Sequence, residues 1–107
     1  VQVEERGSGV VVTVDGQVDM HTSPDLRRPL RKALGGRRTP IIVDLGLVSF
    51  IDSSGLATLI ETRRDIGDYD GELRLAAPQP PVKNLFRLSK LSSIFQIYDT
   101  LDEAVEA

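Results

Sequence analysis

The chain contains no cysteine and no tryptophan, and it has a single histidine. Without cysteine it can form no disulfide and can use no thiol chemistry. One histidine and no cysteine also argue against a zinc or other transition-metal site, because such sites are built mainly from these two residues. The lack of cysteine is compatible with a cytoplasmic location but does not establish one.

Long apolar runs are also missing: none approaches the roughly 20 residues that a membrane span requires, and no signal peptide is visible. The 107 residues suit one domain covering positions 1–107, and the 40% of hydrophobic residues are enough for one core. The net charge of −3 argues against general affinity for nucleic acid.

The most informative stretch is 41–60. It opens with an apolar run of strand length that is rich in β-branched residues, as in a buried strand. It closes with Leu56, Leu59 and Ile60, whose spacing is that of one helix face. Between them lies Asp52-Ser53-Ser54-Gly55, and Asp and Ser are preferred helix N-caps. The pattern predicts strand, loop and helix, with one or two hydroxyls at a helix N-terminus that suits an anion such as phosphate.

The remaining elements alternate around this stretch. We expect a short first strand with Val1, Val3 and Glu5, a turn at 7–9, and further strands over 10–14, 72–76 and 94–98. We expect helices over 23–34 and 53–66, a short helix after Pro81, and a closing helix after Thr100. The order ββαβαβαβα predicts an α/β fold. An N-terminal hairpin and alternating units give a mixed sheet of about five strands with about four helices packed on it.

The helix at 23–34 contains a proline in an unusual place. Ser23 is predicted as its N-cap, Pro24 as the first helical residue, and Asp25 as an acid of the first turn. Pro29 removes one hydrogen bond and clashes with the preceding turn, at a cost of roughly 3 kcal/mol in a regular helix. We therefore expect a kink, or a helix that begins properly only near Pro29.

Two smaller signals concern local geometry. Gly16 follows Asp15 and indicates a bend or bulge before Val18. Thr100 and Glu103 have the spacing of a capping box, in which each side chain accepts from the other residue's backbone N–H.

Charge is distributed unevenly along the chain. Residues 27–38 carry six basic side chains and no acidic one, whereas the segment after Lys90 is acidic only. One interpretation is two solvated surfaces of opposite sign. The other is that one of these surfaces steers a partner.

Three segments resemble one family. Residues 47–51 (LVSFI) followed by 52–56 (DSSGL) are similar to the signature of STAS-domain anti-sigma factor antagonists. Residues 16–22 (GQVDMHT) match the family's G-x-[LIV]-D-x-x-[TN] segment, and 81–89 (PVKNLFRLS) resembles its late helix. The resemblance covers essentially the whole chain in the right order, and it implies the STAS fold.

The resemblance also implies a function. In this family the Ser after Asp in the motif, here Ser53, is phosphorylated by an anti-sigma factor serine kinase, and a PP2C-type phosphatase reverses the modification. The sequence alone does not choose between Ser53 and Ser54, and both hydroxyls could simply cap the helix. The resemblance implies a partner-binding surface made of Asp19, Thr22, Asp52, Ser53, Ser54, Gly55 and Leu56. Asp52 could instead be only an N-cap, Asp19 only a turn or cap residue, and Gly55 could permit a close backbone approach.

On this interpretation the protein is a non-enzymatic switch without a cofactor, in the cytoplasm, and ATP and Mg²⁺ belong to the kinase. A STAS module of a stressosome-like or lipid-transport assembly is the alternative; the short single domain favours the free-standing antagonist. A hydrolase triad of His21, Ser53 and an Asp lacks the G-x-S-x-G elbow. No Walker A or G-x-G-x-x-G pattern predicts a nucleotide site, although weak binding near Ser53 stays open.

Overall fold

The computed structural model describes all residues, 1–107. One sheet holds the strands in chain order: β1 (Gln2–Arg6), β2 (Gly9–Val18), β3 (Ile41–Ile51), β4 (Leu73–Ala76) and β5 (Gln96–Tyr98). β1 and β2 are antiparallel and all other neighbours are parallel. The helices are α1 (Ser23–Gly35), α2 (Ser53–Ile66), α3 (Pro80–Leu88) and α4 (Leu101–Glu106), with 3₁₀ turns at Gly67–Tyr69 and Leu91–Ser93. This confirms the predicted α/β fold and element order.

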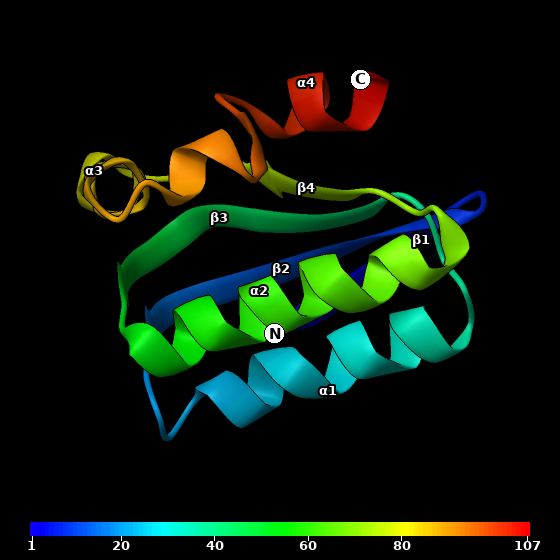
Figure 1. Cartoon of the computed structure of the whole chain (residues 1–107), viewed down its shortest axis with the longest axis horizontal. Helices are drawn as coiled ribbons and strands as arrows, with labels where there is room; N and C mark the ends of the chain where they lie inside the picture. Colours follow the sequence, from blue (N-terminus) through cyan, green and yellow to red (C-terminus); the bar gives the residue numbers. More distant parts are fainter.

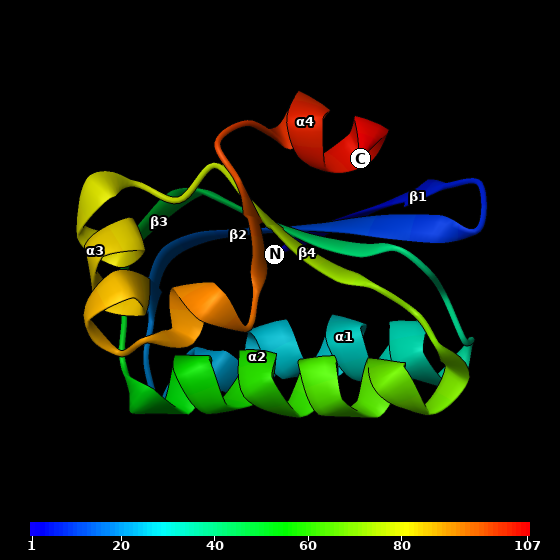
Figure 2. The same ribbon diagram turned by 45° about the horizontal axis from the view of Figure 1, so that its top comes forward.

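The helices cover the sheet unequally. α1 and α2 run side by side along one face, α4 lies on the opposite face, and α3 lies beside the end of β3 (Figures 1 and 2). The main core lies under α1 and α2, where Val12 of β2 packs with Leu30 and Leu59 of the two helices. A small second cluster joins Ala104 of α4 to Ile42 and other residues of the opposite face. Alternating side chains of the strands thus fill two cores of different size. No helix is both long and apolar enough to cross a membrane.

The parallel ladder between β2 and β3 is interrupted at two places. Their pairing is Thr13 with Asp44, Asp15 with Leu47, and Gln17 with Phe50, with irregularities between these pairs. Each irregularity puts one extra residue on β3, as in a β-bulge. Gly16, with φ of +76°, lies opposite them, so the predicted bend or bulge is confirmed at this place. β3 consequently bends toward the start of α2 (Figure 1).

The start of α1 differs from the prediction by one residue. The N-cap is Thr22, its side chain makes no cap hydrogen bond, and Ser23 is a buried first residue of the helix. The prediction of Ser23 as N-cap was wrong because the turn closes one residue earlier: the Ser23 N–H donates to the Asp19 carbonyl at 2.7 Å and the Asp25 N–H to the Thr22 carbonyl at 3.0 Å. The helix also continues through Pro29, so a start near Pro29 was wrong. Leu26 and Leu30, on either side of Pro29, are buried in the same core and hold the helix as one element.

The C-terminal elements follow the prediction with small shifts. Thr100 accepts a hydrogen bond from the Glu103 N–H at 3.1 Å, but the Glu103 carboxylate accepts none from Thr100, so only half of the capping box forms. β5 begins at Gln96 instead of residue 94 because the N–H groups of Ile94 and Phe95 donate to the Leu91 carbonyl in a tight turn.

Much of the basic stretch is paired within the chain. Arg27 and Arg31 of α1 approach Glu61 of α2 at 3.3 and 4.0 Å, and Arg38 donates to the Gly9 carbonyl in β2 at 2.6 Å. These contacts favour a charged structural surface over a free surface that steers a partner.

Candidate functional site

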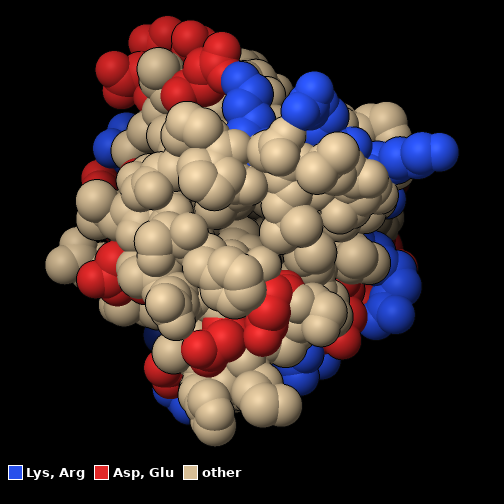
Figure 3. Space-filling model, turned by 90° about the vertical axis from the view of Figure 1, so that its left-hand side faces the viewer, with Lys and Arg blue, Asp and Glu red and all other residues tan.

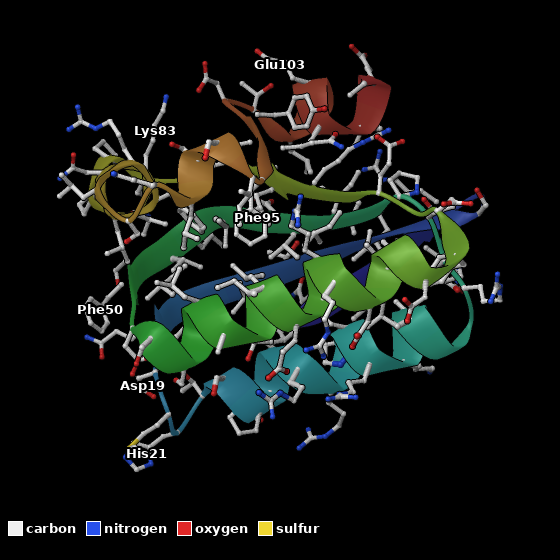
Figure 4. All side chains as sticks on the ribbon, in the orientation of Figure 1. Asp19, His21, Phe50, Lys83, Phe95 and Glu103 are labelled. Carbon is white, nitrogen blue, oxygen red and sulfur yellow. The ribbon has the colours of Figure 1, made fainter.

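The ends of β2 and β3 bring two loops together at one end of the molecule. The Asp52 N–H donates to the carbonyl of Val18, the last residue of β2, at 3.0 Å. The loop from Asp19 to Thr22 therefore lies beside the start of α2. In Figure 4, Asp19, His21 and Phe50 all project from this end.

The first loop is held by its own side chains. The Asp19 carboxylate accepts from the N–H groups of His21 at 2.9 Å and Thr22 at 3.1 Å. The Thr22 hydroxyl donates to the Gln17 carbonyl at 2.7 Å and accepts from the Asp19 N–H at 2.9 Å. The His21 N–H is the main cause that lowers the pKa of Asp19, which is thus held as a carboxylate. Asp19 and Thr22 consequently shape the loop itself.

Asp52 is the N-cap of α2, as predicted. One of its carboxylate oxygens accepts from the Ser54 hydroxyl at 2.6 Å, the Ser54 N–H at 2.8 Å and the Gly55 N–H at 3.2 Å. The Ser54 hydroxyl contributes most to lowering the pKa of Asp52, and the N–H groups of Gly55, Ser54 and Met20 act in the same direction. The bond from the Asp52 N–H to the Val18 carbonyl keeps this first turn beside the loop that follows β2.

The two serines after Asp52 differ in exposure and bonding. Ser54 is half-buried and its hydroxyl donates to Asp52. Ser53 is exposed at the first position of α2, and its hydroxyl makes no hydrogen bond. Ser49 near the end of β3 is also exposed and unbonded, but it lies before the loop rather than at a helix N-terminus. Ser53 is therefore the free hydroxyl at the N-terminus of α2.

Gly55 fixes how closely α2 approaches the two strands. A Cβ placed on it would lie 2.8 Å from Cγ1 of Val18 and 2.8 Å from Cγ2 of Ile51, which real side chains do not tolerate. The predicted close approach is thus confirmed. Leu56, next along α2, is half-buried against the main core. Together the two residues attach the start of α2 to the sheet.

The site offers carboxylates and a hydroxyl rather than a catalytic or metal-binding set. The His21 side chain makes no hydrogen bond, so no triad connects it to Ser53. No group of three His, Asp or Glu side chains could hold a metal ion. Neither Asp19 nor Asp52 takes part in an ion pair. The arrangement can present an unpaired acidic surface and one accessible hydroxyl to another molecule.

Sequence reasoning missed three apolar side chains at this end. Met20 is 70% exposed, Leu47 63% and Phe50 50%. Strict alternation along β3 would not have revealed Leu47 and Phe50, because the irregularities of β3 decide which way these two residues point. Figure 3 looks onto this end and shows a broad uncharged area that contains acidic atoms, with basic atoms mainly toward its margins.

Comparisons with known proteins agree with one another. The family model described as "STAS domain" matches residues 1–104. The Anti-sigma F factor antagonist of Paenibacillus polymyxa is 31% identical over 100 residues, covering 92% of this chain and 86% of that protein. An anti-sigma factor antagonist from Mycobacterium paratuberculosis has a crystal structure with a TM-score of 0.89 and 30% identity, covering 98% and 89% of the two chains. The Bacillus cell fate determinant SpoIIAA in its phosphorylated form gives a TM-score of 0.78 at 28% identity, over 98% and 96% of the chains.

Proposed function

The chain belongs to the STAS domain family, and on that premise we propose that it is an anti-sigma factor antagonist switched by phosphorylation of Ser53. The unphosphorylated chain binds an anti-sigma factor serine kinase, and a sigma factor is thereby released. The kinase then phosphorylates Ser53 and the complex separates. A PP2C-type phosphatase restores the binding form. In this cycle the chain is a substrate and a binding partner, and it performs no catalysis of its own.

The observation that carries the proposal is the free hydroxyl of Ser53 at the N-terminus of α2. A kinase substrate must offer an accessible oxygen without first breaking hydrogen bonds. Ser53 meets this requirement, whereas the hydroxyls of Ser54 and Thr22 are engaged with Asp52 and Gln17. The surroundings of Ser53 are rigid because Asp52 and Gly55 fix the first turn of α2. The names of the relatives support the coarser part of the proposal, an anti-sigma factor antagonist.

The charges around Ser53 explain how phosphorylation could end binding. A phosphoryl group adds a charge of about −1.5 to −2 at neutral pH. The positive end of α2 tolerates that charge, so the fold can stay intact. Asp19 and Asp52 are already negative and unpaired, and no ion pair is present at this end to absorb a further anion. In a docked complex, a phosphate that is buried without a counter-charge, or that faces a like charge of the partner, costs several kcal/mol. About 4 kcal/mol corresponds to roughly a thousandfold in affinity.

Intact-mass spectrometry tests the phosphorylation site directly. The chain is incubated with ATP and each anti-sigma factor serine kinase of its source organism, beside the variants Ser53→Ala, Ser54→Ala and Ser49→Ala. We expect one added phosphate in the wild type, Ser54→Ala and Ser49→Ala, and none in Ser53→Ala. Phosphate on Ser53→Ala would refute the assignment. No gain with any kinase, from a folded chain, would favour a STAS module of another assembly.

A further inference from the structure

Three large apolar side chains on the loop after β2 and the second half of β3 are exposed and do not contribute to the core. They are Met20, Leu47 and Phe50, which we call the apolar rim, and each is at least half exposed. Met20 comes from the loop after β2, and the other two come from the last part of β3. Single exposed apolar residues are ordinary in proteins, but several at one end of a molecule mark an interaction surface.

The geometry of β3 places two members of the rim outward. Leu45 and Val48 are both buried, three positions apart, so Leu47 lies outside the core. Val48 and Ile51 repeat this interval, and Phe50 is likewise outside. The cause is the pair of extra β3 residues in the ladder with β2.

This part of β3 also lacks a strand on its other side, because β4 pairs with β3 only from Ile41 to Asp44. The outward position of Leu47 and Phe50 is thus built into the backbone.

Two members of the rim, Met20 and Phe50, lie close in sequence to the two unpaired carboxylates. Met20 lies two residues after Val18, whose carbonyl accepts from the Asp52 N–H at 3.0 Å, so the loop that carries Met20 begins beside the start of α2. Phe50 lies two residues before Asp52 and projects from the same end as Asp19 (Figure 4). A surface that fits this end must offer apolar walls to the rim and neutral hydrogen-bond donors to the two carboxylates.

We propose that the apolar rim is the docking contact by which this chain holds the anti-sigma factor kinase around Ser53. This inference rests on the proposed function and adds to it the residues that set affinity. The matching partner surface is an apolar recess that admits the Ser53 hydroxyl, with neutral hydrogen-bond donors for the Asp19 and Asp52 carboxylates. The rim carries no reacting group, so it governs how tightly the substrate chain is held and not the rate of phosphoryl transfer once bound.

Steady-state phosphorylation separates these two effects. The double variant Met20→Ala/Phe50→Ala is compared with the wild type, using the kinase that modifies Ser53. We expect KM and Kd to rise at least about 30-fold, the level of an interface anchor, while kcat at saturation stays within about twofold. Met20→Leu/Phe50→Leu, which keeps apolar bulk, should recover most of the affinity.

The control is Val3→Ala in β1. Val3 is 52% exposed and pairs with Val12, six residues before Val18. At about 3.3 Å per residue it lies roughly 20 Å from the site end of β2. This variant should bind and react like the wild type. Because all replaced side chains are exposed, thermal unfolding should show that each variant is folded.

The outcomes distinguish the two proposals. If KM and Kd are unchanged in the Met20→Ala/Phe50→Ala variant and phosphate is still added to Ser53, the apolar rim is not the docking contact, while the proposed function stays intact. A wild-type dimer that becomes monomeric in the double variant at unchanged KM would assign the rim to a second copy and also overturn it. Failure of every kinase to modify the wild type would reject the proposed function, and the rim as a kinase contact with it.

Discussion

Gly55→Ala tests whether the close packing at the start of α2 is required. The new methyl would lie 2.8 Å from side-chain carbons of both Val18 and Ile51, and 3.2 Å from the Val18 carbonyl oxygen. Neither side chain can withdraw freely, because both are buried at the ends of paired strands. The substitution must therefore move α2 or the strand ends.

The expected change in the free energy of unfolding is the cost of overpacking minus the gain in helix propensity. Overpacking a closely packed core costs about 1–3 kcal/mol. Alanine is better than glycine in a helix by up to about 1 kcal/mol. A net loss of about 1 kcal/mol follows, and in a domain of this size it lowers Tm by roughly 4–8 °C.

Gly35→Ala is the matched control, because a Cβ at Gly35 would meet nothing within 4 Å. Gly35→Ala has the better helix propensity of alanine and creates no close contact, so its Tm should rise above that of the wild type.

Thermal and urea unfolding of the two variants measure this directly. Gly55→Ala should unfold earlier and Gly35→Ala later than the wild type. Gly55→Ala should also slow phosphorylation of Ser53, since the Val18 carbonyl that would be displaced also accepts from the Asp52 N–H. A Gly55→Ala variant as stable as Gly35→Ala would refute the packing argument.

Three further predictions concern caps and titration. Ser54→Ala removes the hydroxyl that lowers the pKa of Asp52 most, so NMR titration of the carboxyl carbon should show that pKa rising toward its ordinary value; an unchanged midpoint would contradict this. Folding lowers the pKa values of Asp19 and Asp52, so both carboxylates contribute fully to the free energy of unfolding at neutral pH. Urea unfolding should show this contribution being lost as the pH falls below about 5. A loss of stability between pH 7 and about 5 would contradict its assignment to these two groups. Thr100→Ala should cost about 0.5–2 kcal/mol, seen as a lower Tm, while Ser89→Ala, whose exposed hydroxyl is unbonded, should leave Tm unchanged.

The sequence allowed the element order and most of the core to be predicted. Val10, Val12 and Val14 alternate regularly, and the apolar stripe of α2 follows the helical period, so local patterns were sufficient there. Asp52 was predicted as a cap because Asp before a helical stripe has few other structural uses. The prediction of Ser23 as N-cap was wrong, since the start of α1 depends on how the preceding loop closes through the contacts of Thr22 with Gln17 and Asp19.

The part of the site that could not be predicted depends on pairing between strands. The difference in bonding between the Ser53 and Ser54 hydroxyls required knowing that the Asp52 carboxylate accepts from the Ser54 hydroxyl. The outward position of Leu47 and Phe50 required the register of β3 against β2, which a single apolar run does not reveal. These are three-dimensional facts, and they are the ones on which the proposed docking surface depends.

The affinity of the kinase for the two phosphorylation states tests the central claim most directly. Isothermal titration would compare the unmodified chain with the chain carrying phosphate on Ser53, at the same salt concentration and with the kinase held in a non-hydrolysable nucleotide complex. We predict tight binding of the unmodified chain and a loss of affinity of about a hundredfold to a thousandfold on phosphorylation. Equal affinity of the two forms, with both folded, would contradict the account.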